Sequence, residues 1–312
     1  MTNAAPWPSL EFATWAPTKR SLHLYSQMLG KLRLALAPAQ PNWMFTSLAL
    51  TPRGFTTGAM PYGSASVSAS VDVFVAVMLL ETSDGKRRSI SLAEPRTVAG
   101  VFAGLKSALA ELTIDVALSP VPQEVPDQTP FDVDERPAAF KPDDARRWLA
   151  VVTAISGAFE RWRARFFGRS GIQLWWGAFD FALLLFSGEH VEAPRDRGFL
   201  LEYDLDAQML NVGFYPGDAA NAAIFYGYIY PQPPACEEIP IALDGAEWST
   251  ALKEWILPYG AVGNAADPEA TLTAFLDAVY RIAGEAGGWD LARFTYRAPP
   301  VRRGRRPERP GL

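Results

Sequence analysis

The stretch SLHLYSQMLGKLRLAL, residues 21–36, decides how the first part of the chain folds. Its apolar side chains recur at steps of three and four, the spacing of one face of an α-helix. Prolines stand on both sides, at Pro17 and Pro38, and proline is disfavoured inside a helix. We therefore predict a helix over residues 18–37 with an apolar stripe of Leu22, Tyr25, Leu29, Leu32 and Leu36.

A polar strip occupies the opposite side of this helix and admits two interpretations. Arg20, His23, Gln27 and Lys31 lie next to one another at 100° per residue. Such a strip is typical of a solvated helix face. If a second layer covers the helix, the strip instead lines a cleft, where His23 is the natural proton carrier, Gln27 orients a ligand and Lys31 meets an anionic group.

Outward from this helix, the chain reads as helix, strands, helix, and then the same order again. Residues 66–73 alternate between polar and apolar side chains, the period of a half-buried strand. Neighbouring strands joined by short turns favour antiparallel sheets, so the fold class is α+β with two similar halves. We predict strands at 43–50, 54–59, 66–81, 88–92, 113–119, 172–176, 178–187, 199–205, 208–215 and 223–230, and helices at 97–112, 143–167, 247–256 and 268–286.

The domain prediction is one compact unit over 7–290, with a first half at 7–118 and a second at 142–290. The connector, 119–141, holds five prolines and five acidic residues, which exclude regular structure. The tail, 297–312, is rich in Arg and Pro and is expected to be disordered.

Composition limits the class of protein. Of 312 residues 49% are hydrophobic, enough for a large core, and a single Cys236 excludes an internal disulfide and a cysteine zinc site. No apolar run is long enough for a membrane span, and no signal peptide is visible, so a cytoplasmic protein is expected. The net charge of −5 combines +5 in the tail with −10 elsewhere, which argues against a nucleic-acid groove in the body.

Three further features are candidates for a site. Asp180 lies in the apolar stretch WWGAFDFALLLF, where a carboxylate needs a partner; it is a structural group or a site residue. Arg53 either binds a carboxylate or phosphate of a ligand or pins its loop to Asp180 or to the acidic connector. Tyr226, Tyr228 and Tyr230 alternate on one strand and, with Tyr215 and Trp176, either pack in the core or wall a small-molecule pocket.

The familiar catalytic motifs are missing. Two histidines far apart, His23 and His190, give no HExxH, and there is no GxSxG, GxGxxG or GxxxxGK[ST]. No metal site is predicted and no cofactor can be named.

A resemblance to a known family rests on stretches that follow one another along most of 7–290. They are WPSLEFATWAPTKRSLHLYSQMLGKLRLAL (7–36), LTPRGFTTGAMPYG (50–63), ETSDG (81–85), VPQEVPDQTPFDVD (121–134), WWGAFDFALLLFSG (175–188), GFYPG (213–217) and FYGYIYPQP (225–233). The chain resembles the DUF5996 family, bacterial proteins of unknown function. The resemblance implies a polar turn between strands at 66–73 and 77–82, and histidine in many members where this chain has Phe45, Gln173 and Ala207.

The sequence supports one leading hypothesis. It is a protein that binds a small polar or anionic metabolite in a cleft between the halves. Whether it is an enzyme stays open at this point; if it is one, proton transfer through His23 is the expected chemistry. The ligand-binding residues would be Gln27, Lys31, Arg53, Trp176 and Asp180. The alternative is a non-catalytic interaction or scaffold protein that keeps the fold without an active site. A buried His23 strip that faces a pocket favours the first, and an exposed strip with a flat exposed aromatic patch elsewhere favours the second. Nothing in the sequence fixes the oligomeric state.

Overall fold

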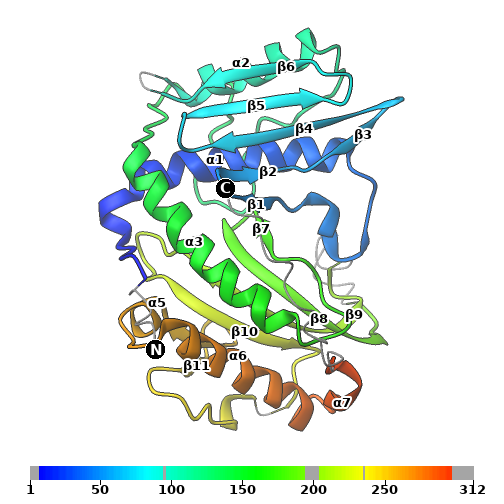
Figure 1. Ribbon diagram of the computed structural model, residues 1–312, viewed down its shortest axis with the longest axis vertical. Coiled ribbons are helices and arrows are strands. Elements are labelled where there is room, and N and C mark those ends of the chain that lie inside the picture. Colours follow the sequence, from blue (N-terminus) through cyan, green and yellow to red (C-terminus); the bar gives the residue numbers. More distant parts are fainter. Residues whose placement is uncertain (1–6, 94–95, 194–203, 235, 297–312) are drawn as a thin grey trace, which may run out of the picture.

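A long helix, α1 (Phe12–Leu36), lies where the two halves meet (Figure 1). The computed structural model describes residues 7–93, 96–193, 204–234 and 236–296. Four residues of the predicted apolar stripe, Leu22, Tyr25, Leu29 and Leu32, are fully buried and Leu36 is partly buried. Much of the polar side of the helix is buried as well. The helix starts earlier than predicted and contains Pro17 in its second turn, where the proline removes one backbone hydrogen bond of the helix.

The first half is an antiparallel sheet covered by α1 and α2 (Val98–Glu111). Its strands pair in the order β1-β2-β4-β5-β6, with β3 beside β4. Alternate residues of β4 are buried, as the period of two predicts. The hairpin implied by the family resemblance is confirmed. The strands are β1 (Ala49–Thr51), β2 (Gly54–Thr56), β3 (Met60–Tyr62), β4 (Ala65–Asp72), β5 (Val77–Thr82) and β6 (Arg87–Ser91).

The second half is another antiparallel sheet, in the order β11-β12-β10-β9-β8-β7, with α3 (Pro142–Arg163) and α6 (Pro268–Glu285) across one face (Figure 1). Phe181 on that face contacts Trp148 of α3, and Gly227 faces Val279 of α6. The opposite face carries the candidate site. The strands are β7 (Gln173–Trp175), β8 (Asp180–His190), β9 (Ala207–Tyr215), β10 (Ile224–Tyr230), β11 (Glu247–Ser249) and β12 (Glu254–Pro258).

Short elements complete the chain and correct three predictions. The helix predicted at 247–256 is the hairpin of β11 and β12, in which Trp248 and Trp255 face each other across the strands. The strand predicted at 43–50 is mostly the 3-10 helix η1 (Pro41–Thr46), and 113–119 forms no strand because it has no sheet partner. The remaining elements are η2 (Cys236–Glu238), α5 (Tyr259–Gly263) and α7 (Leu291–Phe294).

The α+β class is confirmed, and the two halves share their order of elements only loosely. The connector 119–141 holds one isolated bridge, between Thr97 and Pro137, and otherwise neither helix nor strand. Most of the strand predicted at 199–205, and all of the tail 297–312, fall outside the described residues.

Candidate functional site

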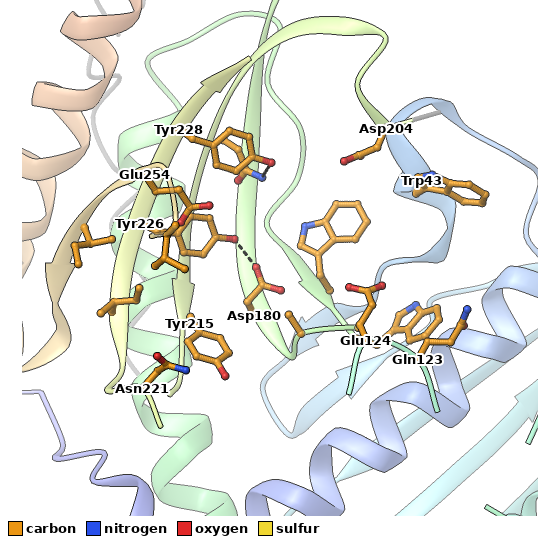
Figure 2. A pocket seen from close by; sticks show the side chains of 18 of the residues that line it. Trp43, Gln123, Glu124, Asp180, Asp204, Tyr215, Asn221, Tyr226, Tyr228 and Glu254 are labelled. Atoms are coloured by element: carbon orange, nitrogen blue, oxygen red, sulfur yellow. Dashed lines mark hydrogen bonds between the residues drawn. The ribbon is translucent and has the colours of Figure 1, made fainter. Parts of the chain in front are cut away.

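A cleft of about 1490 Å³ lies over the face of the second sheet that α3 and α6 leave free (Figure 2). Both halves and the connector contribute residues to its lining. The volume of the cleft exceeds that of most small-molecule sites. Trp43 and Thr46 come from η1, Gln123 and Glu124 come from the connector, and the sheet supplies the floor.

The floor of the cleft is built by strand register. Tyr226 on β10 pairs with Gly213 on β9, and a side chain at Gly213 would collide with the tyrosine ring. Because glycine leaves that space open, Tyr226 lies across β9 and its hydroxyl donates a hydrogen bond to the Asp180 carboxylate on β8 (Figure 2). Beside it, Asn211 donates to the Tyr228 hydroxyl at 2.9 Å. A buried carboxylate such as Asp180 needs a hydrogen-bond partner, and here that partner is the hydroxyl of Tyr226.

Four carboxyl groups line the cleft, and each has a raised pKa because burial disfavours the charged form. Burial raises the pKa of Asp180 to about 6 and that of Glu254 to about 7. The pKa of Asp204 is also about 6, from burial and from the charges of Asp206 and Glu124. Burial raises the pKa of Glu124 as well. In Figure 2 the carboxyl groups of Glu124, Asp180 and Asp204 face one common space.

No cationic side chain belongs to the lining as far as the described residues define it. Two buried lysines lie against aromatic rings of the lining. Lys31 Nζ lies 5.7 Å from the ring centroid of Trp176, and Lys19 Nζ lies 5.4 Å from that of Tyr215. Among the described residues of the lining, the carboxyl groups thus have no countercharge.

Aromatic rings form the walls between the carboxyl groups. Trp176 is fixed in place because its Nε1 donates a 2.9 Å hydrogen bond to the Thr46 carbonyl. Its ring also lies against Gly30 of α1, where any side chain would collide with the indole. The other large rings of the lining are Trp43, Trp175, Tyr215, Tyr226 and Tyr228.

His23 is not at the cleft surface. Its Nε2 lies 3.0 Å from the Trp176 carbonyl oxygen and 2.8 Å from that of Gly177, so this nitrogen carries the proton and donates to both. The ring stacks on Phe179 at 5.2 Å. Burial and the charge of Lys19 lower the pKa of His23 to about 4, which leaves the ring neutral at physiological pH. His23 thus fixes the loop that carries Trp176 and Gly177.

Gln27 and Lys31 are buried beneath the connector. Gln27 Nε2 donates to the Gln123 carbonyl at 2.6 Å, and its Oε1 accepts from the Gln123 N–H at 2.8 Å. Lys31 Nζ donates to the Gln123 side chain at 3.3 Å, and burial lowers the pKa of Lys31 to about 8. Lys31 also borders a smaller space of about 460 Å³ beside the connector. The interpretation of the strip as a solvated face is wrong, because a second layer covers it.

Arg53 lies apart from the other predicted residues. From the turn between β1 and β2 it pairs with Asp72 at the end of β4, and not with Asp180 or the connector, and its guanidinium lies 5.3 Å from the Phe74 ring centroid. The structure thus joins Trp176 and Asp180 in the cleft, places His23, Gln27 and Lys31 behind its wall, and leaves Arg53 elsewhere.

Sequence reasoning missed three carboxyl groups of the cleft. Glu124 lies in the acidic connector, whose composition is typical of exposed chain. Glu254 lies in a segment that was predicted to be a helix. Asp204 reads more simply as an exposed strand residue. One signal was present for Glu124: the motif VPQEVPDQTP is among the stretches that carry the family resemblance.

The comparisons give a family and no function. Neither the curated proteins nor the solved structures compared with the chain gave a match. Over the described residues no helix is long and apolar enough to cross a membrane, and no three His, Cys, Asp or Glu side chains there are grouped to hold a metal ion. The model of the family of unknown function DUF5996 matches residues 7–296. The chain therefore belongs to the DUF5996 family.

Proposed function

We propose that this protein binds a small polar organic molecule that carries ammonium groups, and that the cleft over the second sheet is the binding site. The observation that carries the proposal is the lining itself. Four carboxyl groups and six large aromatic rings surround the space, and no cation balances them among the described lining residues. An ammonium group forms charge-assisted hydrogen bonds with carboxylates and is attracted to aromatic faces.

The negative charge of the lining favours a cationic ligand over an anionic one. The sequence suggested an anionic or polar metabolite, mainly on the strength of Lys31 and Arg53. Both are bound elsewhere, to Gln123 and Asp72, whereas an anion in the cleft would meet Asp180, Asp204 and Glu254. We therefore keep the polar ligand and replace the anionic one with a cation. Proton transfer through His23 is left out, because its Nε2 proton is held by two backbone carbonyls.

The interaction-protein alternative has less support from the surface. Gln27 and Lys31 of the strip are buried, but they lie behind the wall of the cleft and do not face it, so the strip itself does not decide between the two. Within the described part of the chain the large exposed apolar side chains are scattered, and three of them, Leu34, Val121 and Leu252, border the cleft. These three would contact the methylene groups of a ligand as readily as a partner protein.

The test is titration calorimetry with spermidine, a flexible triamine, and with 1,8-octanediol, an uncharged chain of the same number of backbone atoms. We expect spermidine to bind at pH 7.5 at least about tenfold more tightly than the diol, a difference of about 1.4 kcal/mol. Its affinity should fall as NaCl screens the charges. Equal affinities, or no spermidine binding, would overturn the proposal and favour the interaction protein.

A further inference from the structure

We infer that Glu124 is the residue that selects a cationic ligand, and that the polar strip of α1 exists to position it. The inference rests on the proposed function, because it assigns a role within the same cleft. His23, Gln27 and Lys31 do not line the cleft, and this inference gives them a role in positioning Glu124.

The first step is the attachment of the connector to α1. Gln27 is completely buried and holds the backbone of Gln123 with both atoms of its side-chain amide, one donating and one accepting. This arrangement reproduces the two-way pairing of a β-ladder. Lys31 holds the side chain of the same residue. The residue before Glu124 is therefore fixed by three hydrogen bonds to one helix.

The second step is the backbone of Glu124 itself. Its φ is +56°, in the left-handed region that glutamate seldom adopts. Such conformations cost energy and are concentrated at functional sites, where the surroundings impose them. Here the result is that the side chain turns from the connector into the cleft (Figure 2).

The third step is the seat of the Glu124 carboxyl group. It rests against the bare Cα of Gly177, where a Cβ would lie 2.5 Å from its carboxyl oxygens. The carbonyl of Gly177 accepts the Nε2 proton of His23 at 2.8 Å. Gln27 thus fixes the backbone of Gln123, next to Glu124. On the other side, His23 fixes Gly177, against which the carboxyl group of Glu124 rests.

The fourth step is the charge that Glu124 adds. Its carboxylate acts electrostatically on both Asp180 and Asp204, which stand on separate segments of the lining. A ligand with several ammonium groups that spans the cleft would come under the electrostatic attraction of all three carboxylates. Glu124 is the connector's contribution to this cluster, so the connector links α1 to ligand selection.

Two substitutions separate the charge of Glu124 from its position. Glu124→Gln removes the charge and keeps the shape. Gly177→Ala keeps the charge and displaces the carboxyl group, because the new Cβ would collide with that flexible side chain and nothing else lies as near. The matched controls are Glu135→Gln, an exposed carboxylate of the same connector, and Gly171→Ala, where no atom lies within 4 Å of the new methyl group.

Spermidine affinity is measured for each variant by calorimetry, beside its affinity for 1,8-octanediol. We expect Glu124→Gln and Gly177→Ala each to weaken spermidine binding about tenfold or more, as the loss of a charge-assisted contact does. Both should leave diol binding unchanged, and both controls should stay within about twofold of the wild type.

The positioning role is tested by a double-mutant cycle. Gln27→Met removes the attachment of Gln123 at nearly constant volume. If Gln27 acts through Glu124, then Gln27→Met weakens spermidine binding in the wild type but has little further effect in the Glu124→Gln background. A merely structural Gln27 would give independent, additive losses.

The outcomes are distinct for the two proposals. Wild-type binding with unchanged affinity in Glu124→Gln and Gly177→Ala would overturn the role of Glu124 and leave the proposed function standing. Additive losses in the cycle would overturn the positioning by Gln27. Absence of wild-type binding would overturn the proposed function and this inference with it.

Discussion

At the scale of single residues, the two histidines show how the same side chain takes different roles by burial. His23 is enclosed by α1 and the loop of Trp176 and Gly177, whereas His190 is exposed at the end of β8. The imidazole of His23 is held neutral and serves as a hydrogen-bond donor. The sequence places His23 on a polar strip, but it gives no sign that two carbonyls from residues 176 and 177 meet it, because that contact spans more than 150 positions.

His23→Ala should destabilise the protein by about 2–4 kcal/mol, since it opens a cavity against Phe179 and leaves two buried carbonyl oxygens without their donor. Urea unfolding at pH 7 measures this loss. His190→Ala is the control and should stay within about 0.5 kcal/mol of the wild type. Equal stability of the two variants would contradict the role of His23 as a fixing residue.

The same substitution has a pH signature. The folded pKa of His23, about 4, lies below the ordinary value of 6.5. A depressed histidine pKa stabilises the fold above pH 6.5, and that stabilisation is lost as the pH falls toward 4. The advantage of the wild type over His23→Ala should therefore shrink between pH 6.5 and 4. An advantage that stays constant over this range would show that His23 is not held neutral.

At the scale of elements, α1 was predictable and its surroundings were not. The apolar spacing of Leu22 to Leu36 correctly gave a helix with a buried stripe. The other side is buried by the connector, a segment whose prolines and acids are typical of exposed chain. A sequence reports the local preference for an element, but it does not report which irregular segment packs over that element. For the same reason Glu124 was missed, and Gln27 was predicted to contact a ligand although it binds the backbone of Gln123 in the connector.

The contact between Gly30 of α1 and Trp176 of the cleft wall predicts that a side chain at position 30 destabilises the fold. Gly30→Ala would drive a methyl group into the indole of Trp176, which is fixed by its bond to Thr46 and cannot move aside. The strain of about 1–3 kcal/mol should exceed the gain of about 1 kcal/mol that alanine brings to a helix. Gly157→Ala in α3 meets only the flexible Arg161 and should be neutral or stabilising. Thermal unfolding of both variants decides the point, and a stabilising Gly30→Ala would contradict this packing.

At the scale of the whole molecule, two antiparallel sheets meet along α1, and the cleft forms over the uncovered face of the second. The α+β class follows from the order of elements, which local patterns reveal. The position of the cleft does not, because it depends on strand register: Asp180, Tyr226 and Glu254 converge only when β8, β9, β10 and β12 are aligned as they are. The hairpin of β11 and β12 was also mistaken for a helix, which hid Glu254.

The raised pKa of Glu254 in the cleft predicts how the free energy of unfolding depends on pH. The folded pKa of Glu254, about 7, lies above its ordinary value of 4.5. A raised carboxyl pKa stabilises the fold at low pH, and that stabilisation is lost as the pH rises through 7. Glu254→Gln removes this loss, so its stability relative to the wild type should increase between pH 5 and 8. Urea unfolding at both values tests the prediction, with Glu135→Gln as the control. A relative stability that does not change with pH would rule out the raised pKa.

The most direct test of the account is the number of protons released when spermidine binds at pH 6.5. The measurement compares calorimetric titrations in buffers of different ionisation enthalpy. The amines of spermidine remain charged at this pH, whereas the pKa values of Asp180, Asp204 and Glu254, about 6 to 7, leave the cleft partly protonated. A cation that pairs with these groups lowers their pKa values and expels protons. The account predicts proton release at pH 6.5 that diminishes at pH 8.5, and binding without proton release would contradict it.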